Sequence, residues 1–424
     1  MKIEDLHQLF LKFPYATTDT RKIIEKSIFF ALKGNQFNGN EFAQNALDKG
    51  AAYAIVDDEE FVVSDKTILV TNVLQTLQEL ACYHRNHCKA KIIGLTGSNG
   101  KTTTKELISI VLSKKYRTIA TKGNLNNHIG VPLTLLSIRE NTEIAVVEMG
   151  ANHMGEIAFL CSLAQPDYGY ITNFGKAHLE GFGSEEGVIL GKSELYEFLM
   201  GKNRTIFFNA DDPVQQKKLN GYGNKLGFSR ENGENYQIKF EGAHPFVTLE
   251  VAGQIIRSKL IGNYNFMNCC AAVLMGKYLE VPILDIKIAL EGFTPQNNRS
   301  QIIEKNGNHI ILDAYNANPT SMKAALETFE KIPGNNKIAF LGDMFELGET
   351  AHKEHQYIAN LAKELNLNNV YLVGSNFNRT NTTYTKLGTF HDLKSKLAGN
   401  PPKNATILIK GSRGMALERI LDLL

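Results

Sequence analysis

An apolar run that passes through a glycine-rich loop into a helical pattern constrains the fold of this chain more than any other segment. The run KIIG begins at residue 91, the loop GLTGSNGKTTTKE covers residues 94–106, and TTTKELISIVL continues with helical spacing. Gly97 and Gly100 allow the backbone to bend until successive N–H groups point at one anion, and the helix start adds its positive dipole end. The segment therefore predicts a strand–loop–helix unit that binds phosphate.

The residues of this loop favour a nucleoside triphosphate with Mg²⁺. Lys101 supplies a positive charge for the terminal phosphates, and the hydroxyl of Thr102 is placed to coordinate the metal. Leu95 stands where the full G-x-x-x-x-G-K-[ST] pattern has its first glycine, so a shorter G-x-x-G-K-T loop remains. The alternative, a glycine-rich turn with a solvated lysine, is disfavoured by the sequence G-K-T-T. We predict nucleotide contacts from consecutive loop residues: Gly97, Ser98, Asn99, Gly100, Lys101, Thr102 and Thr103.

Apolar strand-like runs alternate with helical patterns through the middle of the chain, which predicts a parallel sheet covered by helices. Besides KIIG, the runs are RTIAT, EIAVVEMG and DYGYITN. Residues 235–262 alternate around Gly253 in the manner of an antiparallel extension. The C-terminal part starts with a hairpin pattern that turns at Asn306-Gly307, and its later strands end in glycine-containing loops. We predict an α/β fold with three domains, at residues 1–88, 89–294 and 295–424.

The composition is that of an ordinary globular protein, with 43% hydrophobic and 21% charged residues in a chain of 424. A formal net charge of +2 argues against a surface committed to nucleic acid or to anionic membrane. The N-terminal segment MKIEDLHQLF lacks the basic and apolar parts of a signal peptide, and no apolar run is long enough to cross a bilayer. The 5 cysteines lack paired spacing, which predicts reduced thiols. We expect a cytoplasmic monomer without nucleic acid or membrane insertion.

One segment carries atoms that zinc could use. CYHRNHC contains Cys82, His84, His87 and Cys88. The segment VLQTLQELACYHRNHC has a helical pattern, however, and its two cysteines then point in different directions. Because four ligands from this helix could not converge on one ion, we predict no zinc site. Nothing suggests haem or flavin.

Three polar residues near strand ends are candidates for chemistry. Glu148 ends the run EIAVVEMG, where a carboxylate beside a phosphate loop commonly holds Mg²⁺; the alternative is an acid that faces solvent. His178 follows another strand, and the pattern fits a structural histidine as well as a ligand. Lys192, in ILGKSELYEF, has the pattern of an exposed helix lysine. The N-K-x-D stretch of GTPases and the protein-kinase signatures are absent. The residues thus predict an enzyme that uses ATP and Mg²⁺, and they leave the reaction open.

Seven segments together resemble the Mur ligases of peptidoglycan synthesis, and they follow family order through the central and C-terminal ranges, while TDTR (18–21) and FFALKG (29–34) resemble the family's N-terminal segments for the UDP-sugar substrate. The seven segments are GSNGKTTTKE, GNLNNHIGVPLTLL, VVEMGANHMGEI, ITNFGKAHLEGFGSEEGV, DAYNANPTSM, LGDMFELGE and KGSRGMALERIL. EMGANHMGEI and DAYNANPTSM are most similar to the type that joins D-alanyl-D-alanine to UDP-N-acetylmuramoyl-tripeptide, and the D-N-P-[RK] stretch of the diaminopimelate-adding type is absent. The resemblance implies a small N-terminal UDP-sugar domain, a central P-loop ATPase domain and a C-terminal Rossmann-like domain.

The resemblance also implies roles for individual residues. Lys101, Glu148, His178 and Lys192 match catalytic positions. Thr102, Glu148, His178 and Lys192 match a site for two Mg²⁺ ions, with Lys192 carbamylated. Asn268, Arg299 and Asp313 match contacts to adenine or ribose. The predicted substrate contacts are Thr20, Arg21, Phe30, Lys33, Asn126, Asn127 and Asn316. Two positions depart from the family pattern, because Tyr264 replaces a histidine and Gly191 replaces an alanine.

The reaction implied by the resemblance is amide formation. ATP would phosphorylate the terminal carboxylate of the tripeptide, and the amine of D-alanyl-D-alanine would displace phosphate from the acyl phosphate. The alternatives are a ligase similar to folylpolyglutamate synthase and an ATP-dependent switch that forms no bond. The TDTR and FFALKG segments of the N-terminal part argue against the first alternative.

Overall fold

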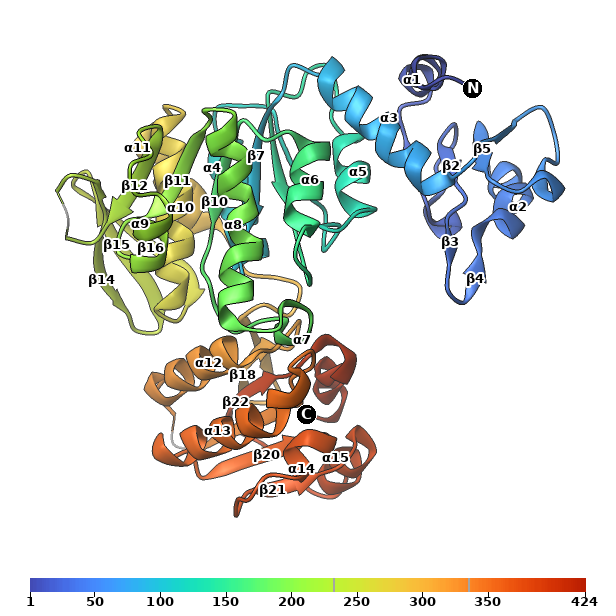
Figure 1. Cartoon of the computed structure of the whole chain (residues 1–424). Coiled ribbons are helices and arrows are strands. Elements are labelled where there is room, and N and C mark those ends of the chain that lie inside the picture. The colour runs from blue at the N-terminus through green and yellow to red at the C-terminus, as the bar shows by residue number, and fades with distance from the viewer. Residues whose placement is uncertain (232, 335) are drawn as a thin grey trace.

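Three mainly parallel β-sheets, each with helices packed beside it, follow one another along the chain (Figure 1). The computed structural model describes residues 1–231, 233–334 and 336–424. The N-terminal part projects to one side of the central part, and the C-terminal part lies below it in the same view (Figure 1). Every strand of the three sheets lies within the three ranges predicted above, and the domain boundaries themselves stay predictions.

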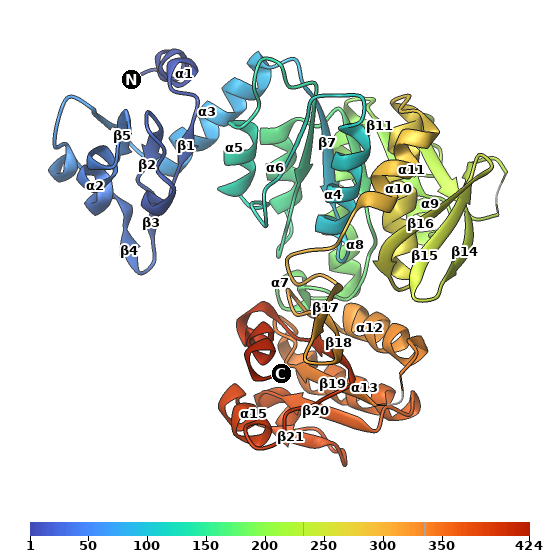
Figure 2. The same cartoon turned by 180° about the vertical axis from the view of Figure 1, so that it is seen from behind.

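The N-terminal sheet is small and parallel, in the order β1-β2-β5-β6. A short antiparallel hairpin, β3–β4, leaves this sheet, and a long helix, α3, connects it to the central part (Figures 1 and 2). The elements are α1 (Ile3–Lys12), β1 (Ala16–Thr17), β2 (Ile28–Phe30), β3 (Lys33–Gly34), β4 (Phe37–Asn38), α2 (Ala43–Asp48), β5 (Tyr53–Val56), β6 (Thr67–Leu69) and α3 (Val73–His87).

The central sheet has seven parallel strands in the order β13-β12-β11-β10-β7-β9-β8. The inner strands β7 and β9 are buried on both faces along almost their whole length, as the continuous apolar runs predicted. The strands are β7 (Lys91–Thr96), β8 (Thr118–Ala120), β9 (Ile144–Glu148), β10 (Tyr168–Ile171), β11 (Thr205–Asn209), β12 (Lys225–Ser229) and β13 (Tyr236–Gln237). Its helices include α4 (Lys101–Leu112), α5 (Gly130–Leu135), α6 (Glu156–Ala164), α7 (Leu179–Phe182), α8 (Glu185–Gly201), α9 (Pro213–Lys218), α10 (Tyr264–Tyr278) and α11 (Ile283–Gly292).

The strand order places the phosphate loop at a switch point. From β7 the chain moves first to β8 and β9 on one side and then to β10, β11 and β12 on the other side. Ligands of open α/β sheets bind at the carboxyl ends of strands at such a point, and the loop after β7 lies there. The predicted antiparallel extension is confirmed by β14 (Lys239–Ala243), β15 (Phe246–Val251) and β16 (Gln254–Ile261), although β13, at the start of that range, joins the central sheet in parallel.

The C-terminal sheet has the order β17-β18-β22-β19-β20-β21. The predicted hairpin is confirmed: β17 and β18 pair antiparallel, and Asn306 and Gly307 turn with φ angles of 50° and 77°. The other neighbours are parallel, so β18, β22 and β19 end at one edge of the sheet. The elements are β17 (Gln301–Lys305), β18 (Asn308–Asp313), α12 (Pro319–Lys331), β19 (Lys337–Gly342), α13 (Ala351–Glu364), β20 (Asn369–Val373), α14 (Ser375–Asn378), β21 (Thr385–Leu387), α15 (Phe390–Leu397) and β22 (Thr406–Lys410).

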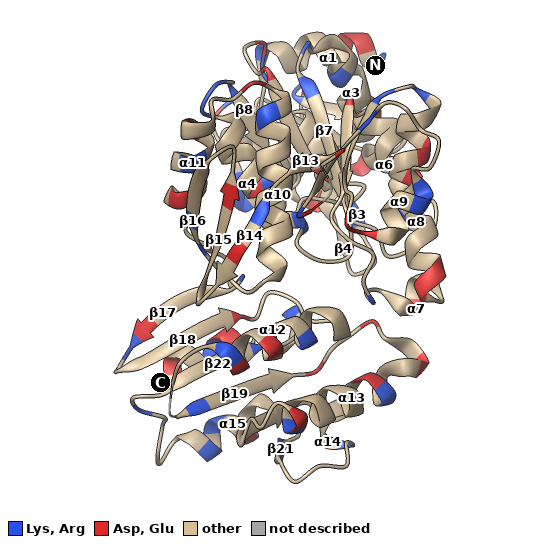
Figure 3. Ribbon diagram, turned by 90° about the vertical axis from the view of Figure 1, so that its left-hand side faces the viewer, with Lys and Arg blue, Asp and Glu red and all other residues tan. Residues whose placement is uncertain are grey.

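Basic and acidic residues are interspersed over the ribbon of all parts visible in Figure 3, in keeping with the small net charge. Across the described ranges, no helix has both the length and the apolar composition that a membrane span needs.

His84 of α3, one of the residues considered above as zinc ligands, contacts protein groups through both ring nitrogens. Its Nδ1 lies 3.0 Å from Nε2 of His7, and its Nε2 lies 3.0 Å from the carbonyl oxygen of Ile138.

A buried carboxylate ties α3 to the central sheet. Oδ2 of Asp167, just before β10, accepts hydrogen bonds from Arg85 Nη2 and from the backbone N–H of Ile92, both at 2.9 Å. Arg204 contacts the other carboxylate oxygen. Arg85 also donates from Nε to the carbonyl oxygen of Ala164 at 3.0 Å. Since Arg85 belongs to α3, this cluster fixes the helix that carries the N-terminal part.

Replacing Asp167 with alanine should lower the free energy of unfolding of the central part by about 3 kcal/mol, because Arg85 and the Ile92 amide would stay buried without their partner. Glu327→Ala is the matched control. Glu327 forms an exposed pair with Lys323 on α12, which contributes less than about 1 kcal/mol. Urea unfolding followed by circular dichroism would measure both effects. Equal small effects would show that the Asp167 cluster adds nothing to stability.

Candidate active site

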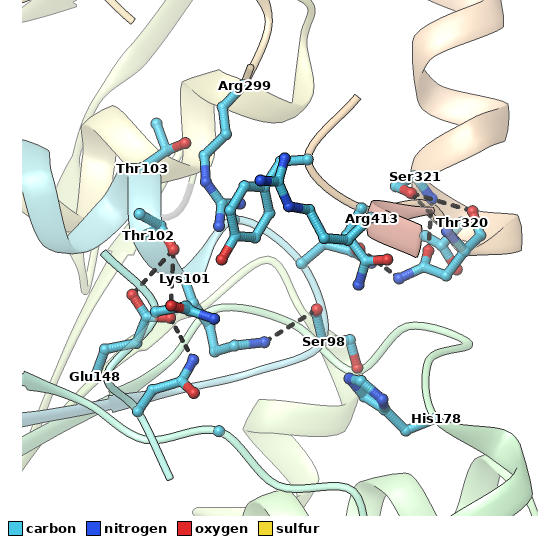
Figure 4. Close-up of a pocket in the computed structure, with 18 of the residues that line it drawn as sticks. Ser98, Lys101, Thr102, Thr103, Glu148, His178, Arg299, Thr320, Ser321 and Arg413 are labelled. Atoms are coloured by element: carbon cyan, nitrogen blue, oxygen red, sulfur yellow. Dashed lines mark hydrogen bonds between the residues drawn. The ribbon is translucent and has the colours of Figure 1, made fainter. Parts of the chain in front are cut away.

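A cavity of about 710 Å³ opens between the central and C-terminal parts (Figure 4). Its central wall contains the phosphate loop and the ends of β9 and β10, and its other wall contains the carboxyl edge of the C-terminal sheet. The predicted residues that line it are Ser98, Asn99, Gly100, Lys101, Thr102, Thr103, Asn126, Asn127, Glu148, His178, Asn268, Arg299, Asp313 and Asn316. Residues far apart in the sequence thus meet in one place.

Two glycines of the phosphate loop are required by its backbone path. Gly97 has φ 139°, and a Cβ atom there would lie 2.0 Å from Oγ1 of Thr172. Gly100, just before α4, has φ 79°, and a Cβ atom would lie 2.7 Å from Oδ1 of Asn268. Both φ angles are in the region that favours glycine. A side chain at either position would therefore disturb the loop that leads into α4.

Lys101 is held inside this loop. Its Nζ donates to the carbonyl oxygen of Gly97 at 2.6 Å. It also donates to the carbonyl oxygen of Ser98 at 3.3 Å (Figure 4). Burial lowers the pKa of the Lys101 amine, and the nearby Glu148 carboxylate opposes that shift. A terminal phosphate would place negative charge beside this ammonium group and so offset the cost of burying it, which supports a phosphate ligand at this loop.

Glu148, at the end of β9, is the buried carboxylate at the centre of the site. Thr102 donates from Oγ1 to Oε2 of Glu148 at 3.0 Å, and Asn126 donates from Nδ2 to Oε1 at 2.8 Å. The side chain is 2% exposed, so the alternative of an acid facing solvent does not hold. The arrangement places a hydroxyl and a carboxylate side by side, and these are oxygen ligands of the kind that Mg²⁺ prefers.

A second buried cation, Lys105, was missed by the sequence analysis. Its Nζ lies 3.6 Å from Oε2 of Glu148 and donates to the carbonyl oxygen of Gly123 at 3.4 Å. The signal was its helical spacing, because Lys105 lies one turn after Lys101 and on the face that also carries Thr102. Lys105 therefore links Glu148 to the loop before α5.

Lys192 is buried, and this corrects the prediction from its helix pattern. Only 1% of the residue is exposed, and its Nζ donates to the carbonyl oxygen of Ala151 at 2.8 Å. The Phe182 ring lies 4.9 Å from Nζ, and a Cβ atom at Gly191 would lie 2.4 Å from that ring. Gly191 therefore provides the space for Phe182. Burial, together with the charge of Lys101, lowers the pKa of the Lys192 amine well below its usual range. A larger fraction of neutral amine is what carbamylation requires.

His178 meets a partner from the C-terminal part. Its Nδ1 lies 2.5 Å from Oε2 of Glu346, an ion pair when the imidazole is protonated. The His178 contact lowers the pKa of the Glu346 carboxyl group. Glu346 follows β19 and was not among the predicted residues, although it lies in the LGDMFELGE segment. The contact shows that the two parts approach each other closely at this histidine.

The residues predicted to contact adenine or ribose lie on both sides of the link between the central and C-terminal parts. Asn268, on α10, accepts from Thr104 Oγ1 at 2.9 Å and donates from Nδ2 to Oδ1 of Asn265 at 2.8 Å. Tyr264, at the position where the family has histidine, pairs its hydroxyl with that of Ser300 at 2.7 Å. The substitution thus places a hydrogen bond between α10 and the start of the C-terminal part.

Across the link, Arg299 and Asp313 are held by neighbours that were not predicted. The guanidinium carbon of Arg299 lies 3.7 Å from the centre of the Tyr315 ring, and Nε of this arginine is buried without a hydrogen bond among the described residues. Oδ2 of Asp313 pairs with Lys410 Nζ at 2.5 Å, and its Oδ1 accepts from the Ser300 amide at 3.1 Å. These contacts leave both residues at the cavity wall.

The predicted substrate contacts divide into two groups. Asn126 and Asn127 lie at the cavity, where Oδ1 of Asn127 also accepts from the Gly130 amide at the start of α5 at 2.9 Å. Asn316 lies on the C-terminal wall, and its backbone oxygen accepts from Lys410 at 3.3 Å. The others lie in the N-terminal part, and the cavity lining given by the described residues does not include them: Thr20, Arg21, Phe30 and Lys33.

Within the N-terminal group the surroundings differ. Arg21 is exposed and pairs with Asp19 at 2.9 Å, and this pairing lowers the pKa of Asp19 to about 2. Lys33, on the β3–β4 hairpin, lies 3.1 Å from Oδ1 of Asp57. Phe30 is fully buried in the core of the small sheet, so its side chain has a packing role and any ligand contact would have to come from its backbone.

A closed phosphate loop, a buried carboxylate beside it and a second α/β layer across the cavity define a nucleotide-using enzyme whose site is shared by two domains. Three family domains match the chain: the Mur ligase family catalytic domain at residues 15–85, the Mur ligase middle domain at 95–276 and the Mur ligase glutamate ligase domain at 298–413. The chain belongs to the Mur ligase family.

Relatives of known activity cover nearly the whole chain. It is 36% identical to the UDP-N-acetylmuramoyl-tripeptide–D-alanyl-D-alanine ligase of Bacillus subtilis (strain 168), over 95% of this chain and 91% of that protein. The ligase of the same name from Escherichia coli (strain K12) is 32% identical, over 96% and 92%. A crystal structure of MurF from Acinetobacter baumannii is similar with a TM-score of 0.86 at 30% identity, over 100% and 98%. The MurF ligase of Thermotoga maritima, solved with ADP, gives 0.83 at 30% identity, over 97% of each chain.

Gly100→Ala should weaken nucleotide binding by at least roughly tenfold, because alanine would have to adopt a φ of 79° and would overlap the Asn268 side chain. Gly201→Ala, at the exposed end of α8, is the matched control, since a Cβ atom there has open space. Titration calorimetry with ADP would compare the two variants with the unmodified protein. Unchanged affinity in Gly100→Ala would contradict the assigned nucleotide position.

Proposed function

We propose that this chain is the ATP-dependent ligase that joins D-alanyl-D-alanine to UDP-N-acetylmuramoyl-tripeptide during peptidoglycan precursor synthesis. Two observations support the proposal together. The phosphate loop, Glu148 and the C-terminal wall meet in one cavity, and a ligase of this activity is similar to the chain along 95% of its length. We place the enzyme in the cytoplasm as a monomer; its 5 cysteines are free, in keeping with a reducing compartment.

The site suits the activation of a carboxylate. An amide forms from a carboxylate and an amine only after the carboxylate oxygen has become a leaving group. ATP would transfer its γ-phosphoryl group to the tripeptide's terminal carboxylate, and ADP would leave. The amine of D-alanyl-D-alanine would then attack the acyl carbon, with phosphate as the leaving group. Lys101 and the loop N–H groups would stabilise the charge that develops on the transferred group.

The residues present fit Mg²⁺. Oγ1 of Thr102 and Oε2 of Glu148 lie 3.0 Å apart, and these two residues would hold one ion. His178 and Lys192 would contribute to a second, provided that the neutral amine of Lys192 reacts with carbon dioxide and so becomes an anionic oxygen ligand. When bound, the ions would offset the negative charges of the triphosphate and the carboxylate.

Contacts across the cavity would help to exclude water from the acyl phosphate. Asn318 donates from Nδ2 to Oδ1 of Asn99 in the phosphate loop at 2.8 Å. Lys176, after β10, pairs with Glu354 of α13 at 3.3 Å, and its amide N–H donates to Oγ1 of Thr320 at 3.0 Å. These contacts hold the C-terminal wall against the central wall, as a water-sensitive intermediate requires.

The two alternatives are not favoured. A folylpolyglutamate synthase-like ligase would be expected to match other relatives, whereas several UDP-N-acetylmuramoyl-tripeptide–D-alanyl-D-alanine ligases are 31–36% identical over nearly the whole chain. A switch that forms no bond is likewise not favoured, because the relatives that match nearly the whole chain are ligases.

The purified protein should release ADP and phosphate only when UDP-N-acetylmuramoyl-tripeptide and D-alanyl-D-alanine are both present, because the acyl phosphate is consumed only by the dipeptide amine. Coupled ADP detection with mass spectrometry of the product would measure this. Tripeptides with diaminopimelate or lysine at the third position should be compared in the same assay. Robust ATP hydrolysis that ignores both substrates would overturn the proposal.

Lys192→Ala should lower the ligation rate by at least roughly 100-fold, and small carboxylates such as acetate should restore part of it by supplying oxygen ligands. Lys202→Ala, at the exposed C-cap of the same helix, is the control and should keep full activity. Ligation that is unaffected by Lys192→Ala would remove this residue from the metal site, and a protein that acts as a switch would be indifferent to the change.

A further inference from the structure

Lys105 is a buried cation that lies behind the carboxylate of the candidate metal site. Its side chain is 2% exposed, and its Nζ lies 3.6 Å from Oε2 of Glu148. The described residues that line the cavity include Lys101, Thr102 and Glu148 but not Lys105. A ligand in the cavity would therefore contact Glu148 directly, whereas Lys105 would act on that ligand through the carboxylate.

The surroundings of Lys105 keep its charge in place. Besides its contact with Glu148, the ammonium group donates to the carbonyl oxygen of Gly123 at 3.4 Å. The backbone N–H of Glu148 donates to Oγ1 of Thr121 at 2.9 Å, so the end of β9 and the segment with Gly123 are also joined to each other. Because the side chain is enclosed in this way, the ammonium group has no direct path into water when another cation approaches.

The Glu148 carboxylate is shared between Lys105 and the predicted Mg²⁺ ligands. Thr102 donates from Oγ1 to Oε2 of Glu148 at 3.0 Å (Figure 4), the same oxygen that lies near Lys105. A divalent ion held by Thr102 and Glu148 would thus have this carboxylate in common with the ammonium group. Two cations at one carboxylate repel each other, and the repulsion is strong where burial lowers the effective dielectric constant.

The charges of the protein do not compensate a divalent ion at this place. Glu148 interacts with two buried ammonium groups, those of Lys101 and Lys105. The neighbouring Glu106 carboxylate interacts electrostatically with Lys105 and also with Arg299. A divalent ion alone would therefore add to positive charge that these carboxylates already balance. Nucleotide phosphates at the loop would supply the negative charge that such an ion needs.

We propose that Lys105 is a positioning residue that makes metal binding at Thr102 and Glu148 depend on the nucleotide. The inference rests on the metal site of the proposed function. Lys105 holds the Glu148 carboxylate in place and opposes a divalent ion that arrives alone. An ion that arrives with nucleotide phosphates belongs to a complex with net negative charge, which the same ammonium group attracts. Lys105 thus selects the metal–nucleotide complex over the free ion.

The test measures Mn²⁺ binding, because Mn²⁺ prefers the same oxygen ligands as Mg²⁺ and its unbound fraction is measured by electron paramagnetic resonance. Lys105→Met removes the charge and keeps a long side chain. Without nucleotide, this variant should bind Mn²⁺ roughly tenfold more tightly than the unmodified protein does. It should bind the Mn²⁺–ADP complex no more tightly than the unmodified protein. Damage to the fold or to the loop would weaken both, so a gain for the free ion alone identifies the charge effect.

Two further variants of lysine and one of Glu148 complete the experiment. Lys114→Met is the matched control, because Lys114 is exposed just after the same helix, and it should change neither affinity. Lys105→Gln keeps a hydrogen-bond donor without the charge and should also tighten Mn²⁺ binding, so the test holds if Lys105→Met does not fold. Glu148→Gln, added to either Lys105 variant, should remove the tightened binding and so locate it at this carboxylate.

The role of Lys105 is overturned if loss of its charge changes the affinity for free Mn²⁺ by less than about threefold or weakens it, or if binding of the Mn²⁺–ADP complex tightens by the same factor as that of the free ion. None of these measurements needs ligation. If Glu148→Gln leaves the tightened binding unchanged, the metal site itself is wrong. A protein with the expected binding that forms no ligation product overturns only the proposed function.

Discussion

The buried carboxylate of Glu148 is the constraint on which the site depends. A carboxylate removed from water is costly by several kcal/mol unless opposite charge and hydrogen bonds compensate it. Here the compensation comes from Thr102 and Lys105 of α4 and from Asn126 of the loop before α5. Because both segments contact the same Glu148 carboxylate, this carboxylate holds the phosphate loop and the Asn126 loop in fixed positions relative to each other. The ligands of the reaction therefore meet a site that is largely arranged before they arrive.

The topology explains why this arrangement lies where a second domain can complete it. β7 is flanked by β9 and β10, so the loop after β7 and Glu148 at the end of β9 reach the same edge of the central sheet. The C-terminal sheet presents its own carboxyl edge to that side. Each wall alone carries only part of the cavity lining: the residues proposed to bind phosphate and Mg²⁺ on the central wall, and Asp313, Tyr315 and Arg413 on the other.

Features encoded in short segments were predictable from the sequence, and features that arise from distant packing were not. The strand–loop–helix unit and the C-terminal hairpin followed from apolar runs and glycines, and Glu148 followed from its place at a strand end. Lys192 was different. Its helix pattern indicated exposure, whereas Phe182 and the Ala151 carbonyl enclose it in the fold. Tyr315 and Arg413 lay within recognised segments, but only the meeting of three strand ends gives them a place at the cavity.

The hydrogen bond between Tyr264 and Ser300 has a thermodynamic consequence. It joins the helix that carries Asn268 to the first residues of the C-terminal part, at the point where the chain crosses between the two walls. A nucleotide with the proposed contacts to Asn268 on one side and Asp313 on the other would bind one relative orientation of the walls more tightly than any other. By linkage, the same difference in affinity shifts the population of orientations. The adenosine end of the nucleotide would then act as the effector of closure, at a distance from the phosphates that react.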